Sequence, residues 1–385
     1  MMSTIITKKP KIAIVHDFLT YFGGAEQVLR SLHRLYPRAP IYTLLYDENK
    51  MKEYFPDAKI IPSFLNSLPR FIRNKKKFLL PLFSTATETF DLRDYDMVIS
   101  SSSSFVKGII TKPKTVHVCY CHTPTRFLWD WHYNYLDENR MFGLKRLIIM
   151  PFLHYLRMWD KAAAERVDHF IANSKNTSDR IKKYYNRESA VIYPPVDVAK
   201  PCEDAAEKIP EKDYFLIVSR LSPYKKIAVA VEAFNKLELP LVVIGEGSER
   251  KRLEGMAGKN IRFLGFRKEH ELAAYYKNCQ AFIFPGEDDF GIAPCEAMSF
   301  GKPVLAYRKG GATETVIEGV TGEFFNDMIP EILADGVRRL KNNYGKYDPK
   351  AIRGHAMLYS RENFEKNIAN FIDSVMEGGG NRKSA

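Results

Sequence analysis

A repeated alternation of short apolar strands with amphipathic helices constrains this chain more than any other feature. The first repeat has a continuous apolar run at 11–15, a loop at 16–24 and a helix at 25–36 whose apolar residues recur at helical spacing. Such strand–helix repeats predict a parallel sheet with helices on both faces. The remaining strands of this series are expected at 41–45, 97–100, 115–121, 168–172 and 191–193.

A second series of the same kind begins after a break in the chain. Pro194 and Pro195 end the first series, and the polar stretch 198–212 is typical of a linker. New strands are expected at 215–219, 241–244, 261–264, 281–284 and 303–306. The 385 residues exceed one usual hydrophobic core, so the predicted fold class is α/β with two doubly wound, Rossmann-like domains facing a cleft.

The richest stretch for chemistry is 281–298. A short apolar strand ends at Pro285 and Gly286, acidic residues follow, and a helix is expected to begin near Pro294 with Glu296 in its first turn. Backbone N–H groups at a strand–turn–helix junction bind anions, and the neighbouring carboxylates accept hydrogen bonds from the hydroxyls of a sugar. Acidic residues at a turn can also be plain solvation or a preference of a helix N-terminus.

Three other loops follow predicted strands. Gly23 and Gly24 open the first helix, where paired glycines let a ligand approach the backbone, although they do not form the dinucleotide fingerprint. Arg220 and Lys225 follow the first strand of the second series and suit phosphate oxygens. His122 ends a strand and is either a ligand-contacting residue or a satisfied loop histidine.

We predict no metal site. His117, Cys119 and Cys121 lie on one face of a predicted strand, but no second ligand pair with zinc-site spacing accompanies them. Asp94 and Asp96 precede a strand and are expected at the amino end of the sheet as a solvated turn.

Charge and composition favour an anionic partner. The formal net charge is +12, which suits nucleic acid, an acidic membrane surface or phosphorylated substrates. The five cysteines show no framework spacing, nothing before Lys11 resembles a signal peptide, and no apolar run reaches the roughly 20 residues of a membrane span. These features predict a cytoplasmic protein.

Two segments combine cations with large apolar side chains and lack acids. In 64–83 this combination suits docking on an anionic membrane as well as it suits a solvated face over a core-facing stripe, and both interpretations stay open. In 139–159 we favour the solvated face over a core-facing stripe.

Taken together, these motifs resemble the retaining GT-B glycosyltransferases of the large family once called group 1, of the family 4 type. The resemblance covers nearly the whole chain, and the versions of its motifs around His122 and around 193–197 look like mannosyltransferase-type members from bacteria that build O-antigen or exopolysaccharide. It implies transfer of a hexose, with mannose favoured, from a nucleotide sugar such as GDP-mannose to a lipid-linked or glycan acceptor, without a metal.

The two strand–helix series give a domain layout, to which the resemblance adds the return of the last helix. The acceptor-side domain covers 1–197, the linker 198–212 and the nucleotide-sugar-binding domain 213–359. A helix at 360–376 returns to the N-terminal domain, and a disordered tail covers 377–385.

By resemblance, Glu296 binds the donor ribose, Arg220 and Lys225 hold the diphosphate, and His122 contacts the donor sugar. The family signature pairs two glutamates, but here Asp288 stands at the partner position with Glu287 one residue earlier. Which of these two carboxylates contacts the sugar stays open. The supporting backbone is expected at Gly23, Gly24, Gly265, Phe266, Phe290, Gly291 and Ile292.

Two alternatives stay open on sequence alone. A GT-B sugar-nucleotide epimerase or hydrolase keeps the fold and changes the reaction. A basic nucleic-acid-binding protein is suggested by charge, but no recognition helix or aromatic ribonucleoprotein motif is present.

Overall fold

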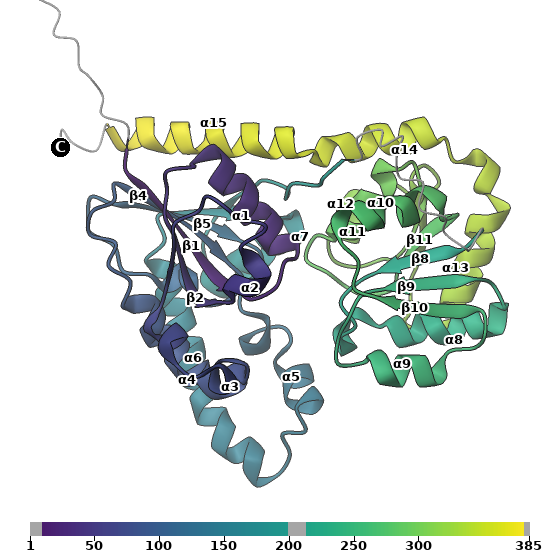
Figure 1. The fold of residues 1–385 in the computed structure, drawn as a ribbon, viewed down its shortest axis with the longest axis horizontal. Coiled ribbons are helices and arrows are strands. Elements are labelled where there is room, and N and C mark those ends of the chain that lie inside the picture. Colours follow the sequence, from purple (N-terminus) through teal and green to yellow (C-terminus); the bar gives the residue numbers. More distant parts are fainter. Residues whose placement is uncertain (1–9, 199–212, 381–385) are drawn as a thin grey trace, which may run out of the picture. The chain divides into compact units, whose positions relative to one another are not determined.

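The structure is a computed structural model that describes residues 10–198 and 213–380. Most of the expected linker 198–212 and the end of the expected tail therefore lie outside the described residues. Two compact units divide the chain: the N-terminal unit contains the residues up to Tyr193 together with those from Glu365 onward, and the C-terminal unit is Pro194–Phe364. Each unit is an α/β sandwich around one parallel sheet (Figure 1).

The N-terminal unit has a seven-stranded sheet in the order β3-β2-β1-β4-β5-β6-β7, and all its pairs are parallel. Its strands are β1 (Ile12–Leu19), β2 (Ile41–Tyr46), β3 (Ile60–Pro62), β4 (Met97–Ser102), β5 (Val116–Cys121), β6 (His169–Ala172) and β7 (Ser189–Val191). Its helices are α1 (Gly24–Leu35), α2 (Glu48–Met51), α3 (Arg70–Arg73), α4 (Lys76–Glu88), α5 (His132–Glu138), α6 (Leu144–Glu165) and α7 (Lys175–Tyr185), with 3-10 turns at Phe64–Ser67, Val106–Gly108 and Arg126–Leu128.

The first strand is longer than predicted. We expected a loop from residue 16, but β1 continues to Leu19, with Phe18 beside Leu45 of β2 and His16 beside Ser101 of β4. The polar His16 and Asp17 interrupt the apolar run, yet both are buried because neighbouring groups satisfy their side chains. The short edge strand β3 was not predicted from the sequence. The other edge strand, β7, begins two residues earlier than the predicted strand at 191–193.

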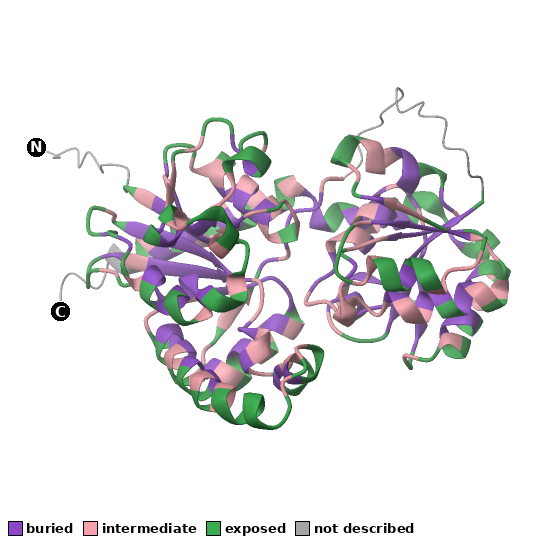
Figure 2. Ribbon diagram, turned by 60° about the horizontal axis from the view of Figure 1, so that its bottom comes forward, coloured by how far each residue is buried: buried purple, intermediate pink, exposed green. Residues whose placement is uncertain are grey.

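The C-terminal unit has a six-stranded parallel sheet in the order β10-β9-β8-β11-β12-β13. Its strands are β8 (Phe215–Val218), β9 (Leu241–Ile244), β10 (Ile261–Gly265), β11 (Ala281–Phe284), β12 (Val304–Tyr307) and β13 (Gly322–Phe325), of which we missed the last. Its helices are α8 (Ile227–Leu237), α9 (Arg250–Met256), α10 (Glu269–Asn278), α11 (Ile292–Ser299), α12 (Ala312–Thr315), α13 (Pro330–Asn342) and α14 (Pro349–Ala356), with 3-10 turns at Pro223–Lys225, Tyr344–Lys346 and Met357–Tyr359. The strands of both sheets are largely buried (Figure 2).

The chain passes between the two units at residues 193–194 and again at 364–365. Within the C-terminal unit, the segments next to these two points lie side by side. Val196 forms a parallel bridge with Ser360, and Arg361 pairs with the carboxylate of Asp197. The last helix, α15 (Arg361–Gly380), buries an apolar stripe that includes Phe364 and Ile368. It continues four residues beyond the predicted end at 376, so the expected disordered tail is helical as far as Gly380.

Candidate active site

The C-terminal unit places its predicted cations and acids at one point of its sheet. Strands β8 and β11 are neighbours in the sheet. After β8 the chain continues to β9 on one side, and after β11 it continues to β12 on the other side. The carboxyl ends of such a strand pair form the crevice where open α/β sheets bind ligands. The loop after β8 carries Lys225, the loop after β11 carries Asp288, and the two side chains form an ion pair across the crevice.

The ion pair keeps Lys225 cationic. Burial disfavours the ammonium, but the Asp288 carboxylate and Tyr224 outweigh this effect, so the pKa of Lys225 lies above its ordinary value. Arg220 is exposed and donates a 2.8 Å hydrogen bond to the Tyr224 hydroxyl. Two cations therefore flank Tyr224 at the carboxyl end of β8, as an anion-binding site requires.

Close backbone packing holds three loops together here. A side chain on Gly286 would come within 2.9 Å of the Lys225 Cα. In the loop after β12, Gly310 has φ +64°, and a Cβ there would lie 2.3 Å from the Asp288 carbonyl oxygen. The N–H of Gly311 donates to that same carbonyl at 2.9 Å. These glycines let the loop after β12 fix the backbone beside the ion pair.

Helix α11 begins earlier than predicted. Gly291, with φ +90°, is its N-cap, and the helix starts at Ile292. Since Pro294 is its third residue, Glu296 lies in the second turn and not in the first. The N–H groups of Gly291 and Ile292 have no acceptor among the residues that the structure describes. They suit an anion or a hydroxyl oxygen.

Glu296 has a fixed orientation. Its Oε2 accepts a 2.8 Å hydrogen bond from Tyr276 of α10. Burial, and then the Glu296 carboxylate, raise the pKa of Tyr276 well above its ordinary value, so the phenol stays a donor. Because Glu296 is only partly buried, its carboxylate can accept further donors.

The other predicted backbone contributors, Phe290, Gly265 and Phe266, lie at two places in this unit. Phe290 is 3% exposed and packs its ring against Tyr359, so only its backbone can take part. Gly265 and Phe266 lie at the end of β10, the edge strand two positions from β8. Phe266 is 58% exposed there.

In the N-terminal unit, His122 follows β5 and is partly buried. Its Nε2 lies 2.8 Å from the Ser101 hydroxyl. Burial, and then the neighbouring His16, lower the pKa of His122 to about 3, so the ring is neutral near pH 7. Gly23 is the N-cap of α1, which begins at Gly24, and it supplies no side-chain cap.

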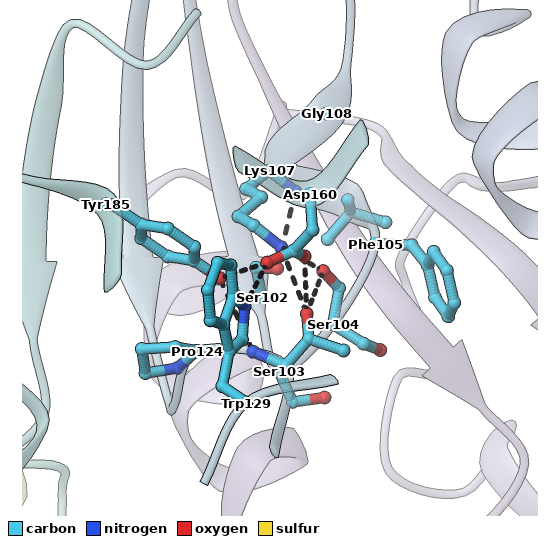
Figure 3. Close-up of polar contacts among 12 residues, drawn as sticks. Ser102, Ser103, Ser104, Phe105, Lys107, Gly108, Pro124, Trp129, Asp160 and Tyr185 are labelled. Carbon is cyan, nitrogen blue, oxygen red and sulfur yellow. Dashed lines mark hydrogen bonds and ion pairs between the residues drawn. The ribbon is translucent and has the colours of Figure 1, made fainter. Parts of the chain in front are cut away.

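Two buried networks hold the loops around His122. The Asp17 carboxylate accepts the N–H groups of residues 103–106, at distances from 2.6 to 3.0 Å. Lys107 and Asp160 form a buried ion pair, and Asp160 also accepts from Trp129 at 2.7 Å and Tyr185 at 2.8 Å (Figure 3). The loops after β4 and β5 are therefore tied to α6 and α7.

Within residues 10–198 and 213–380, no group of three or more His, Cys, Asp or Glu side chains is placed to hold a metal ion. His117 is fully buried with its Nε2 2.8 Å from Ser100. Asp96 accepts the Lys11 N–H at 2.8 Å, and β4 begins at the next residue, which places it at the amino end of the sheet as predicted.

Sequence reasoning missed two residues of these sites. Ser101 contacts both His122 and His16, but it lies within a run of five serines that singles out none of them. Tyr276 lies 20 residues before Glu296, and no local pattern joins the two.

Two family profiles match adjacent parts of the sequence. The family described as Glycosyltransferase Family 4 matches residues 22–200, and Glycosyl transferases group 1 matches residues 200–354. The chain carries two glycosyltransferase domains. The boundary between the two matches lies close to the division between the two units.

Relatives of these glycosyltransferase domains share about a quarter of their residues with the chain. The uncharacterized glycosyltransferase MJ1178 of Methanocaldococcus jannaschii is 27% identical over 192 residues, which cover 49% of this chain and 53% of that relative. The chain thus spans about half the length of MJ1178. The alpha-1,3/1,6-mannosyltransferase ALG2 of Dictyostelium discoideum is 23% identical, with 96% of this chain and 98% of the relative covered.

A solved structure shows the same fold. The crystal structure of Anabaena Alr3699/HepE in complex with UDP-glucose has a TM-score of 0.68 at 19% identity, and the match covers 94% of this chain and 99% of that chain. This likeness confirms the predicted GT-B fold class of two Rossmann-like domains.

Proposed function

We propose that this protein is a retaining glycosyltransferase that moves a hexose, with mannose favoured, from a nucleotide diphosphate sugar to a lipid-linked or polysaccharide acceptor. The observation that carries the proposal is the Lys225–Asp288 ion pair at the β8–β11 crevice, within a chain that has two glycosyltransferase domains. The ALG2 relative, a mannosyltransferase by name, supports mannose, and GDP-mannose is the favoured donor. The motif versions around His122 and 193–197 favour O-antigen or exopolysaccharide synthesis.

The proposed chemistry needs cations where the leaving group departs. As the bond between the anomeric carbon and the phosphate oxygen breaks, its electron pair goes to the departing diphosphate. Arg220 and Lys225 stabilise this growing negative charge without a required metal. The acceptor hydroxyl forms the new bond to the anomeric carbon, and its proton goes to the oxygen of the departing diphosphate.

The other residues bind the donor. Glu296 accepts hydrogen bonds from the ribose hydroxyls, and the N–H groups of Gly291 and Ile292 support the sugar and phosphates. His122 contacts the donor sugar, while Gly23 and Gly24 let the diphosphate approach α1. Asp288 or Glu287 takes the remaining sugar hydroxyls, the backbone of Phe290 supports the sugar and phosphates, and Gly265 and Phe266 lie at the base of the donor site.

The reaction class is tested by mixing pure protein with sugar nucleotides. A thermal-shift screen of GDP-, UDP- and ADP-sugars first identifies the donor. Release of nucleoside diphosphate that depends on an added acceptor supports a transferase. Interconversion of the sugar, or release without an acceptor, would instead support an epimerase or a hydrolase.

The first variant to test in the donor site is Glu296→Gln. It should raise the donor Kd about tenfold, since an amide accepts fewer hydroxyl hydrogen bonds than a carboxylate and the loss of one charged bond costs about 1.5 kcal/mol. Donor binding by calorimetry measures the effect. Glu254→Gln, on the exposed face of α9, is the matched control. An unchanged donor Kd in Glu296→Gln would contradict the ribose assignment.

Asp288→Asn and Glu287→Gln should be compared side by side. Asp288 already pairs with Lys225. Asp288→Asn should therefore change kcat, because it removes the carboxylate that holds the Lys225 ammonium. Glu287→Gln should act on the donor Kd if Glu287 contacts the sugar. A pair of variants with wild-type kinetics would overturn our assignment of this loop.

We further propose that the N-terminal unit docks on an anionic membrane surface on the cytoplasmic side. Helices α3, α4, α5 and α6 gather in one part of this unit around a shared core (Figure 1). We call the exposed side chains of these helices and of the loop before α6 the basic apolar surface. Its most exposed apolar members, 60–75% accessible, are Phe71, Phe78, Phe142, Leu144, Leu147 and Ile148.

This surface changes our interpretation of residues 139–159. We favoured a core-facing stripe there, but Leu144, Leu147 and Ile148 are exposed and only later residues of α6, such as Leu153 and Leu156, are buried. No helix within residues 10–198 and 213–380 is both long and apolar enough to span a bilayer. Exposed apolar side chains among cations suit the membrane interface.

The cations fall into two groups. Arg73 donates to Asn66 at 3.0 Å, and Lys76 donates to Thr20 at 2.8 Å, so both contribute to packing. Lys75, Lys145 and Arg146 are exposed and suit lipid headgroups.

The triple change of Lys75, Lys145 and Arg146 to Gln should reduce sedimentation with anionic liposomes, most strongly at low salt. Each cation near such a surface contributes about 1 kcal/mol, and salt screens this attraction. Changing Lys251, Lys259 and Lys277 of the C-terminal unit to Gln removes the same charge and should have no effect. Equal binding of the wild type to neutral and anionic liposomes, or binding to neither, would contradict the electrostatic proposal.

A further inference from the structure

Four side chains form a continuous polar chain inside the N-terminal unit. His122 Nε2 lies 2.8 Å from the Ser101 Oγ, and this hydroxyl lies 3.1 Å from His16 Nδ1. The other ring nitrogen of His16, Nε2, lies 3.4 Å from Glu26 Oε1. The chain thus crosses from the end of β5 through β4 and β1 to the first turn of α1.

Burial isolates this chain from water at its inner end. Ser101, His16 and Glu26 are 0%, 2% and 3% exposed, whereas His122 is partly exposed. Glu26 Oε2 is buried without a partner among the described residues, so Oε1 makes the contact that matters here. The N-terminus of α1 favours the negative charge of this carboxylate.

The donors and acceptors of these four side chains fix the direction in which their hydrogen bonds run. A carboxylate only accepts hydrogen bonds, so His16 donates from Nε2 to Glu26, and in an imidazole with a single ring hydrogen Nδ1 then accepts. The Ser101 hydroxyl donates to that nitrogen and therefore accepts from Nε2–H of His122. In the neutral ring of His122, Nδ1 then carries no hydrogen and is an acceptor.

We propose that Glu26, His16 and Ser101 are positioning residues that hold His122 as the Nε2–H tautomer, so that its Nδ1 accepts a hydrogen bond from a hydroxyl of the donor sugar. The last clause rests on the proposed function. No group among residues 10–198 and 213–380 bonds to Nδ1 of His122, which leaves this nitrogen available to a ligand.

The tautomer can be measured without substrate. Long-range proton–nitrogen NMR spectra of protein with ¹⁵N-labelled histidine distinguish protonated from unprotonated ring nitrogens, and His122→Asn identifies the His122 signals. Wild type should show Nε2 protonated and Nδ1 unprotonated. Ser101→Ala should lose this preference, and Ser101→Thr, which keeps the hydroxyl, should restore it.

The same strand provides a matched control. Ser100 is also fully buried in β4, but its hydroxyl contacts His117 at 2.8 Å and not His122. Ser100→Ala removes an equivalent buried hydroxyl and should leave the His122 tautomer and the transfer rate unchanged. If Ser100→Ala had the same effect as Ser101→Ala, both effects would come from a general disturbance of β4, and the proposal would be overturned.

Kinetics tests the catalytic consequence. Glu26→Leu removes the acceptor of His16 Nε2 and should lower kcat/KM for the donor about tenfold, the size of one charge-assisted hydrogen bond. An unchanged tautomer in Ser101→Ala and Glu26→Leu would overturn the inference even if the enzyme transfers sugar. Absence of transfer by the wild type would overturn the proposed function, while the NMR measurement would still decide the tautomer.

Discussion

Replacing Lys225 by alanine should lower kcat about 100- to 1000-fold, because removing one preorganised donor from a developing oxyanion typically costs this much. The charge that Lys225 meets grows as the diphosphate departs, so the donor KM should change less than kcat. The structure adds a second reason, since the variant leaves Asp288 without its partner beside the leaving group. Arg220→Ala should act in the same direction.

Steady-state kinetics with the donor found by thermal shift measures this effect. Lys251→Ala, which removes an exposed lysine on α9, is the matched control and should leave kcat unchanged. Full dependence of activity on Mg²⁺ or Mn²⁺, together with wild-type rates for Arg220→Ala, would contradict stabilisation by the two cations.

Replacing Lys107 by alanine should lower the free energy of unfolding of the N-terminal unit by about 3–5 kcal/mol, the cost of leaving a buried charge without its partner. Lys107 and Asp160 are 2% and 1% exposed at their side chains, so water cannot solvate the remaining carboxylate. Trp129, Tyr185 and Thr125 also donate to Asp160, and their positions depend on its orientation.

Urea unfolding followed by tryptophan fluorescence measures this loss, since Trp129 bonds to Asp160 directly. Lys114→Ala, an exposed lysine of the same unit, should change the unfolding free energy by less than about 0.5 kcal/mol. Equal stability of the two variants would show that the ion pair contributes nothing net. Because the network ties down the loops beside His122, transfer by Lys107→Ala should also fall at temperatures below its unfolding.

The sequence by itself determined the architecture of this protein. Continuous apolar runs identify buried parallel strands, and those at 241–244 and 281–284 match β9 and β11 in both bounds. The polar residues that follow these runs mark loops at the carboxyl ends of strands. Lys225, Asp288 and Glu296 are therefore predicted as site residues from the sequence.

Only the tertiary structure decided which side chains meet. Asp288 pairs with Lys225 across 63 residues of sequence, and Ser101 joins His16 to His122 across three strands. Neither contact has a local signature, because strand order and loop packing bring together residues that share no sequence period. The same reason explains α6, where we favoured a solvated face over a core-facing stripe for 139–159, but the first turns of the helix expose Leu147 and Ile148.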